Sequence, residues 1–209
     1  MVQRQKIEIR EQIILTALSE FADKGYFGTT LKAIAEKSKC SIGNIYKYFS
    51  NKDELFKSAF PPSLVEQSKQ LIKRRVKAIG IATDIQRLDQ LHPYRAASEE
   101  LITFTSEHRL QMIFLLSNAK GSRYSDFKND IIEELTDLAI DYASKAYPGI
   151  KINGFKKGML KRFYKAFIFQ LVAILKEEKC ETKFRDAAED VAIYHLSGLK
   201  AFFINLEEK

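Results

Sequence analysis

The sequence predicts an all-α protein in which an N-terminal three-helix domain with a helix-turn-helix precedes a larger C-terminal helical domain. Apolar residues recur at helical spacing through most of the chain, and Gly- and Pro-containing pairs separate these periodic segments. No segment shows the sustained alternation of a β-strand. We expect the first domain to cover residues 1–55, with its motif at 30–49, and the second domain to cover 56–209.

The first helix is expected from residue 3 to about residue 24, because Gly25 is a residue type at which helices commonly end. Its buried stripe is expected to contain Ile7, Ile13, Ile14, Ala17, Leu18 and Phe21.

Residues 29–55 indicate two short helices joined by a tight turn, followed by the start of a further helix. Thr29 or Thr30, then Ser41, then Asn51 precede these helices, and their side chains suit helix N-caps. In the second helix Ile42, Ile45 and Phe49 are expected to face inward. The outward polar residues suit a helix that lies in the DNA major groove. An ordinary helical hairpin with solvated polar faces is the alternative.

Four segments at fixed spacing make the pattern more specific. They are GYFGTT at 25–30, Ile34-Ala35, SIGNIYKYF at 41–49 and NKDEL at 51–55. Together they resemble the DNA-binding domain of the TetR family of bacterial transcription regulators. The resemblance covers about the first 60 residues. The residues expected to contact DNA are Thr29, Thr30, Lys39, Ser41, Ile42, Gly43, Asn44, Tyr46, Lys47, Tyr48 and Lys52.

The turn departs from the family pattern at two positions. Lys39 stands where the family usually has Gly, and Cys40 stands where a small aliphatic residue is usual. If the turn needs a positive φ, Lys39 carries a modest strain. Cys40 is either a redox-sensitive thiol or a small apolar residue that fills the turn.

The positive charge is confined to one end of the chain. The net charge is +3 over residues 1–60, +4 over 61–80 and zero over 81–209. Such an asymmetry is typical of an end that binds a polyanion.

Composition and motifs disfavour the other classes of protein. Hydrophobic residues make up 45% and charged residues 29% of the chain, as in ordinary soluble proteins, and no apolar run is long enough to span a membrane. The N-terminal residues lack the apolar region of a secretory signal, and two cysteines offer no disulfide framework, so the cytoplasm is the expected location. We find no nucleophile, phosphate-loop or metal-ligand motif, and therefore expect no enzyme activity, metal or cofactor.

The remainder of the chain is expected to form helices at about 84–91, 94–105, 107–118, 125–146, 155–178 and 182–205. Pro61-Pro62 should break the helix that follows the motif, either as a signalling hinge or as a plain bend.

The last two helices each have two apolar faces, and a helix of this kind must bury both. One face can pack within the chain and the other against a second copy, which gives the four-helix dimer interface that the family resemblance implies. The expected interface residues are Phe155, Met159, Ala188, Ala192, His195, Leu199 and Phe202.

The family resemblance also implies a small-molecule effector that releases a repressor from a palindromic double-stranded DNA operator. An apolar or aromatic effector suits the residues expected to line its pocket, which are Phe104, His108, Gln111, Met112, Phe127, Phe163, Tyr164 and Phe167. A DNA-binding regulator without a ligand and a helical protein-interaction module are the alternatives. The sequence identifies neither the operator nor the effector.

Overall fold

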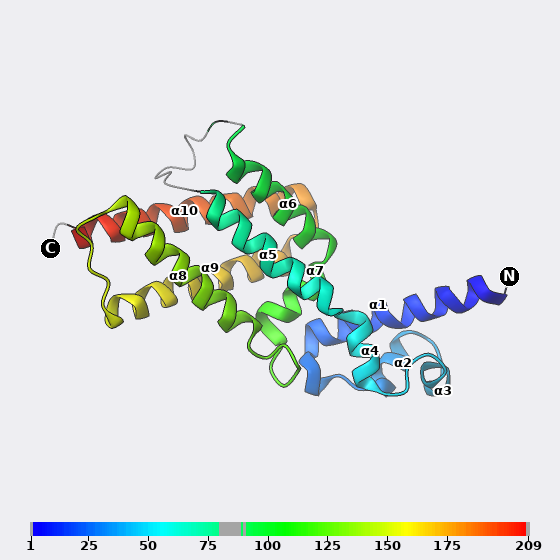
Figure 1. Cartoon of the computed structure of the whole chain (residues 1–209). Coiled ribbons are helices and arrows are strands. Elements are labelled where there is room, and N and C mark those ends of the chain that lie inside the picture. The colour runs from blue at the N-terminus through cyan, green and yellow to red at the C-terminus, as the bar shows by residue number, and fades with distance from the viewer. Residues whose placement is uncertain (1, 80–88, 90, 208–209) are drawn as a thin grey trace. The chain divides into compact units, whose positions relative to one another are not determined.

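In the computed structural model, every regular element of the described residues is a helix, as predicted (Figure 1). The structure describes residues 2–79, 89 and 91–207, so most of the helix expected at 84–91 lies outside the described residues. The elements are α1 (Val2–Gly28), α2 (Leu31–Lys37), α3 (Ile42–Tyr46), α4 (Lys52–Ala59), α5 (Pro62–Ala78), α6 (Pro93–Glu107), α7 (Arg109–Ile113), the π-helix η2 (Phe114–Asn118), α8 (Phe127–Ala146), α9 (Gly154–Glu177) and α10 (Glu181–Glu207).

The chain packs into two compact units. Unit 1 contains Met1–Gln67 and His108–Phe127, and unit 2 contains Ser68–Glu107 and Lys128–Lys209. The N-terminal helices therefore share one unit with α7 and η2, which follow them far along the chain. The expected division between residues 55 and 56 remains a proposal about which part binds DNA and which part regulates.

Side-chain caps begin α2, α3 and α4 at the residues that the sequence predicted. Side-chain oxygens of Thr30, Ser41 and Asn51 accept hydrogen bonds from backbone N–H groups three residues ahead, at 3.1, 3.2 and 2.9 Å. Each bond satisfies a donor that has no partner inside its own helix. The starts of these helices are therefore set by local chemistry.

Gly25 and Pro61-Pro62 interrupt the helices as expected. Gly25 has φ 70° and ψ 179°, a conformation that favours glycine and that stops the long first segment of α1. Phe60 has φ −128° and ψ 71°, and α5 then begins at Pro62, where the missing N–H costs no helical hydrogen bond. A signalling hinge at this break remains a proposal.

Four phenylalanines form the centre of unit 1. Phe21 lies on α1, Phe56 lies on α4, Phe60 directly follows α4, and Phe114 lies on η2. All four side chains are at most 2% exposed. The ring centroids of Phe21 and Phe56 are 5.1 Å apart, those of Phe56 and Phe60 4.7 Å, and those of Phe60 and Phe114 4.5 Å. Contacts of this kind add about 0.5–1.5 kcal/mol per pair to the effect of burial. This cluster joins α1, α4 and η2 into one core.

The predicted stripe of α1 is correct in its C-terminal part and wrong at its start. Ile13, Ala17 and Phe21 are fully buried, whereas Ile7 is 54% exposed. The first turns of α1 project beyond α2, α3 and α4, so nothing in these helices covers them (Figure 1).

A buried carboxylate joins α1 to α2. Glu20 is 0% exposed, and its two oxygens form ion pairs with Lys37 of α2 and with Lys24, the latter at 2.9 Å. Burial raises the pKa of Glu20, but the hydrogen bonds from Lys37 and Lys24 outweigh it, so the pKa lies below its ordinary value. The ionised carboxylate therefore stabilises the folded state.

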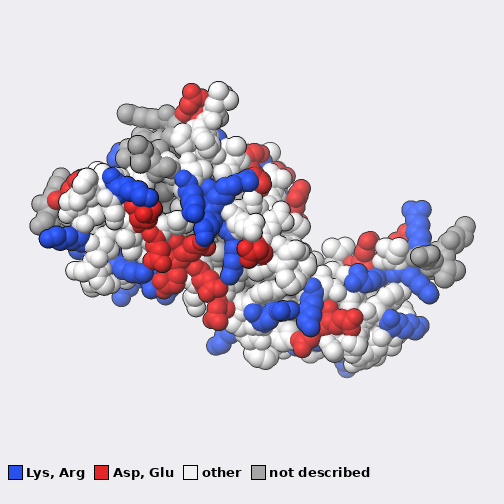
Figure 2. Space-filling view, viewed as in Figure 1, with Lys and Arg blue, Asp and Glu red and all other residues white. Residues whose placement is uncertain are grey.

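Ion pairs hold α8 to its neighbours in unit 2. Asp130 and Glu134 pair with Lys69 and Lys73 of α5, and Asp137 pairs with Lys157 of α9. Figure 2 shows acidic side chains gathered along α8, with lysine and arginine side chains on both sides. Such exposed pairs contribute little individually, but they specify which faces meet.

The turn between α2 and α3 has the conformation that makes Lys39 unusual. Lys39 has φ 54°, and no other non-glycine residue among the described ones has a positive φ. Its backbone N–H donates to the carbonyl of Glu36 at 3.3 Å, which closes the turn. A side chain in this left-handed region costs about 1–2 kcal/mol. The strain expected from the sequence is therefore present.

Replacing Lys39 should reveal this strain. We expect Lys39→Gly to have a free energy of unfolding about 1 kcal/mol higher than Lys39→Ala, because glycine adopts positive φ without a Cβ clash. Denaturant titration of both variants measures the difference. At Glu36, within α2, the same pair should show the opposite order, since glycine is the poorer helix former there. Equal stability of the two Lys39 variants would disprove the strain.

Glu20→Gln should lower the free energy of unfolding by about 2 kcal/mol at neutral pH, because the buried charge that both lysines bind is lost. The contribution of the charge is complete above the unfolded-state pKa. It is lost as pH falls through the lower pKa of the folded state, so wild type and variant should converge in acid. Thermal or denaturant unfolding at several pH values measures this, with the exposed Glu8→Gln as control. A difference between wild type and Glu20→Gln that does not change with pH would contradict the assignment.

Candidate nucleic-acid interface

Two buried apolar side chains, one on α3 and one shortly after it, fix this helix against the rest of unit 1. Ile45 is 0% exposed and Phe49 is 1% exposed, so both face inward as predicted. The guanidinium of Arg10 lies over the Phe49 ring, 5.2 Å from its centroid, and adds a contact from α1. The opposite side of α3 is therefore free to face a partner.

Most of the predicted DNA contacts lie on α3 or directly beside it in the chain. The exposed members are Thr30, Lys39, Ser41, Ile42, Gly43, Tyr46 and Lys47, and the half-buried members are Asn44, Tyr48 and Lys52. The Nζ atom of Lys47 donates to Oδ1 of Asn44 at 3.1 Å, which leaves the Asn44 amide group as a free donor. The prediction that Ile42 faces inward is wrong, since it is 44% exposed at the first position of α3.

Thr29 is a correction to the predicted contacts. Its side chain is 0% exposed, and its hydroxyl donates to the carbonyl of Gly25 at 2.8 Å. The hydroxyl therefore satisfies the backbone at the α1 break, and its burial excludes direct contact with DNA. The neighbouring Thr30 is the exposed residue that caps α2.

Lys52 has an internal role that the sequence did not indicate. Its ammonium donates to the carbonyls of Tyr26 and Thr29 at 2.9 and 3.1 Å, and it lies 4.3 Å from the centroid of the Tyr26 ring. Two of its three donors therefore fix the segment between α1 and α2. Contact of the third donor with a phosphate remains a prediction.

Tyr26 and Asp53 support this arrangement, and sequence reasoning assigned a role to neither. The hydroxyl of Tyr26 donates to the carboxylate of Asp53 at the start of α4. Burial and this carboxylate raise the pKa of Tyr26 to about 12, so the phenol stays protonated and remains a donor. Tyr26 lies in the GYFGTT segment and Asp53 in the NKDEL segment. The presence of both segments in the family pattern was the only sequence signal for a contact between these two residues.

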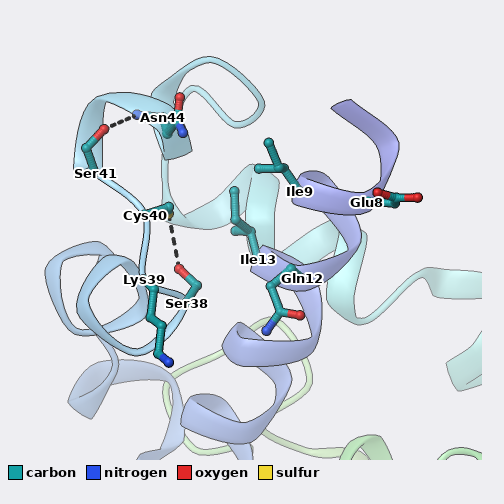
Figure 3. A pocket seen from close by; sticks show the side chains of 9 residues that line it. All are labelled: Glu8, Ile9, Gln12, Ile13, Ser38, Lys39, Cys40, Ser41 and Asn44. Carbon is teal, nitrogen blue, oxygen red and sulfur yellow. Dashed lines mark hydrogen bonds between the residues drawn. The ribbon is translucent and has the colours of Figure 1, made fainter. Parts of the chain in front are cut away.

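A groove of about 410 Å³ lies beside the turn (Figure 3). Glu8, Ile9, Gln12 and Ile13 of α1 line one side, and residues 38–41 with Asn44 line the other. Figure 3 shows Ile9 and Ile13 pointing from α1 toward the turn and α3, whereas the Glu8 side chain points away. Within it the sulfur of Cys40 lies 3.1 Å from the hydroxyl of Ser38, and both interpretations of this cysteine remain open.

The predicted effector residues lie in both units. His108, Gln111, Met112 and Phe127 belong to unit 1, and Phe104, Phe163, Tyr164 and Phe167 belong to unit 2. In unit 2, the rings of Tyr164 and Phe167 both contact His195, at centroid distances of 4.9 and 4.3 Å. The pocket itself remains a proposal.

Three predicted dimer residues need correction. Ala188, Ala192 and Leu199 are 8%, 2% and 5% exposed, because their stripe of α10 packs within unit 2. Helical spacing indicated two apolar stripes on α10, but it did not distinguish the internal one from the external one. His195 and Phe202 likewise pack on α9 residues, with Phe202 5.3 Å from Phe163.

The opposite faces of α9 and α10 are apolar and exposed. Phe155 and Phe169 on α9 are 72% and 75% exposed, and Tyr194 on α10 is 75% exposed. Met159 is half-buried beside them. These residues carry the external stripe.

The described residues contain neither a metal site nor a membrane span. None of their His, Cys, Asp and Glu side chains gather in threes as a metal site would require. No described helix is both long enough and apolar enough to cross a membrane.

Residues 13–59 match the profile of the family described as bacterial regulatory proteins, tetR family. The matched range runs from α1 to the end of α4 and includes the whole of the turn and α3.

Several regulators are similar to this chain. The HTH-type transcriptional regulator HbdR of Aromatoleum sp. is 35% identical over 81 residues, which are 39% of this chain and 34% of HbdR. The probable acrEF/envCD operon repressor of Escherichia coli is 34% identical over 107 residues, 49% of this chain and 43% of the repressor. The HTH-type regulator YfiR of Bacillus subtilis is 21% identical over the full chain and 80% of YfiR. The chain thus spans less than half the length of the first two.

Solved structures of regulators are also similar. One from Aquifex aeolicus is 17% identical, with a TM-score of 0.49, over 89% of this chain and 99% of that one. A TetR-like regulator from Rhodococcus sp. is 22% identical, with a TM-score of 0.44, over 92% and 93%. The profile match confirms the resemblance that the sequence segments indicated: residues 13–59 of this chain are similar to the DNA-binding domain of the TetR family of bacterial regulatory proteins.

Proposed function

We propose that this protein is a homodimeric, sequence-specific repressor of the cytoplasm that a small apolar or aromatic effector releases from its operator. The observation that carries the proposal is the exposed face of α3, which two buried residues hold in place between capped helix starts. Helices of this kind present their first residues to base edges in the major groove.

Asn44 is the residue proposed to read a base. Its Oδ1 atom accepts a hydrogen bond from Lys47, so the side chain is oriented before DNA arrives. An asparagine amide can pair with both N6 and N7 of adenine, provided that Lys47 yields its bond to the base. Lys39, Lys47 and Tyr46 are exposed around it and are proposed to bind phosphates.

The external stripe of α9 and α10 is proposed to form the dimer interface. Besides Phe155, Phe169 and Tyr194, it includes Gly158 in the second turn of α9 and Gly198 within α10. A Cβ atom at either glycine would meet nothing within 4 Å. Glycine inside a helix costs about 1 kcal/mol relative to alanine, so two of them on an exposed apolar face favour a closely approaching second helix.

A two-fold dimer would present two copies of α3 to successive major grooves, about 34–36 Å apart on one side of the duplex. The effector would favour a conformation in which the spacing of the two α3 helices no longer matches the spacing of the major grooves. It would thereby reduce the population of dimers that can bind DNA. The effector must bind the released conformation more tightly for such a shift to occur.

Selection of bound duplexes from a random DNA pool tests the function directly. We expect purified full-length protein to enrich one palindromic sequence, with half-sites about one helical turn apart or slightly more. Affinity for it should fall steeply between two salt concentrations, because bound phosphates release counterions. Binding without any enriched sequence would contradict the proposed specificity.

Asn44→Ala should reduce the affinity for the selected site by about 1–3 kcal/mol and relax the preference at one position of each half-site. Fluorescence anisotropy with the selected duplex and with duplexes altered at each position measures both effects. Lys145→Ala, which removes an exposed lysine of unit 2, is the control and should change neither. An unchanged base preference in Asn44→Ala would remove this residue from the reading face.

Gly198→Arg should convert the dimer to a monomer. Because nothing lies within 4 Å of the added Cβ, the substitution should not destabilise the isolated chain, whereas the bulky side chain would separate two apposed helices. Sedimentation velocity measures the mass. Ser144→Arg on the exposed part of α8 is the matched control and should remain dimeric. A dimeric Gly198→Arg variant would place the interface elsewhere.

A further inference from the structure

Arg75 differs from three other cations of α5. Lys69, Lys73 and Arg74 each pair with a carboxylate, namely Asp130, Glu134 and Glu100. The half-buried Arg75 instead donates to two hydroxyl groups on α6. Its Nε atom lies 3.0 Å from Ser98 Oγ, and its Nη2 atom lies 2.6 Å from the hydroxyl of Tyr94.

The guanidinium is also placed by an aromatic ring. Its central carbon lies 5.0 Å from the centroid of the Tyr94 ring, and Tyr94 is only 6% exposed. Both hydroxyls use their oxygen to accept from Arg75, so each retains its own O–H as a donor. The positive charge is therefore held in place among donors, and none of the described acidic residues forms an ion pair with it.

His195 on α10 is a second polar group of unit 2 with an unused hydrogen-bonding atom. Its Nε2 atom is buried and has no hydrogen-bond partner within the described structure. The ring stacks on Phe167, with centroids 4.3 Å apart at 18°, and it also contacts Tyr164. Burial, and then the charge of Arg75, lower the pKa of His195 to about 4, so the imidazole is neutral near pH 7.

An anionic ligand would satisfy these groups. A buried polar atom without a partner costs about 1–3 kcal/mol, and a half-buried cation without a counter-charge adds to this cost. An anion beside Arg75 would supply the missing charge, and it would accept hydrogen bonds from the guanidinium and the hydroxyls.

We propose that unit 2 binds a small carboxylate with an apolar body, whose carboxylate lies at Arg75, Tyr94 and Ser98 and whose body lies along Phe167 and Tyr164. A guanidinium matches a carboxylate in shape and in single charge, whereas a phosphate ester carries up to two charges. The aromatic rings beside His195 suit an apolar body. This inference rests on the proposed function, since it gives the chemical class of the effector.

The test compares carboxylic acids with their uncharged amides on full-length protein. Acetate, hexanoate, decanoate and benzoate are each titrated at neutral pH against the corresponding amide, with the melting temperature as the readout. At one hundred times its Kd, a bound carboxylate should raise the melting temperature by about 5–10 °C, and its amide should not. Equal shifts for acid and amide, or no shift with any of the four acids, would overturn the proposal.

Two neighbouring arginines provide the matched variants. Arg75→Gln should weaken carboxylate binding by roughly tenfold or more, because the counter-charge is lost, while Arg74→Gln should bind as the wild type does. If Arg75→Gln shows no cooperative melting, Tyr94→Phe, which keeps the ring and removes the hydroxyl, replaces it. Carboxylate binding that survives both Arg75→Gln and Tyr94→Phe would overturn the assignment. No DNA is present in this assay, so its failure is distinct from failure of the proposed repressor function.

Discussion

The contact of Phe21 with Phe56, Phe60 and Phe114 is the constraint on which unit 1 depends. These rings come from α1, from the end of α4 and from η2, so a single cluster joins the N-terminal helices to a later part of the chain. Interiors pack densely, and a displacement of Phe114 cannot leave the other rings unchanged. Asn118 reinforces the joint, because its amide donates to the carbonyl of Ala22 at 2.5 Å.

The reading surface depends on this core through polar contacts. Glu20 ties α1 to α2, and Lys52 ties the start of α4 to the carbonyls of Tyr26 and Thr29. Neither residue needs to touch DNA to matter, since each fixes a helix next to α3. The strained φ of Lys39 is maintained because the helices on either side of the turn are anchored independently.

The polar groups of unit 2 are paired in two ways. Its helices exchange lysine–carboxylate pairs along α8, whereas the half-buried Arg75 donates to two hydroxyls and the Nε2 atom of His195 has no hydrogen-bond partner among the described residues. Titratable groups with perturbed pKa values, such as His195, cluster at functional sites. Arg74 pairs with a carboxylate and Arg75 with two hydroxyls. This difference in partners is more informative about a binding site than the number of charges on α5.

The sequence by itself determined the all-helical class, the caps at Thr30, Ser41 and Asn51, and the breaks at Gly25 and Pro61-Pro62, because capping and backbone restriction act within a few residues. It also indicated the resemblance of the N-terminal residues to a TetR-family DNA-binding domain, through residues at fixed spacing. Tertiary structure decided which of two apolar stripes on a helix faces inward, and it buried Thr29, exposed Ile42 and formed the π-helix η2. Periodicity shows that a face is apolar, but only the neighbouring helices determine what covers that face.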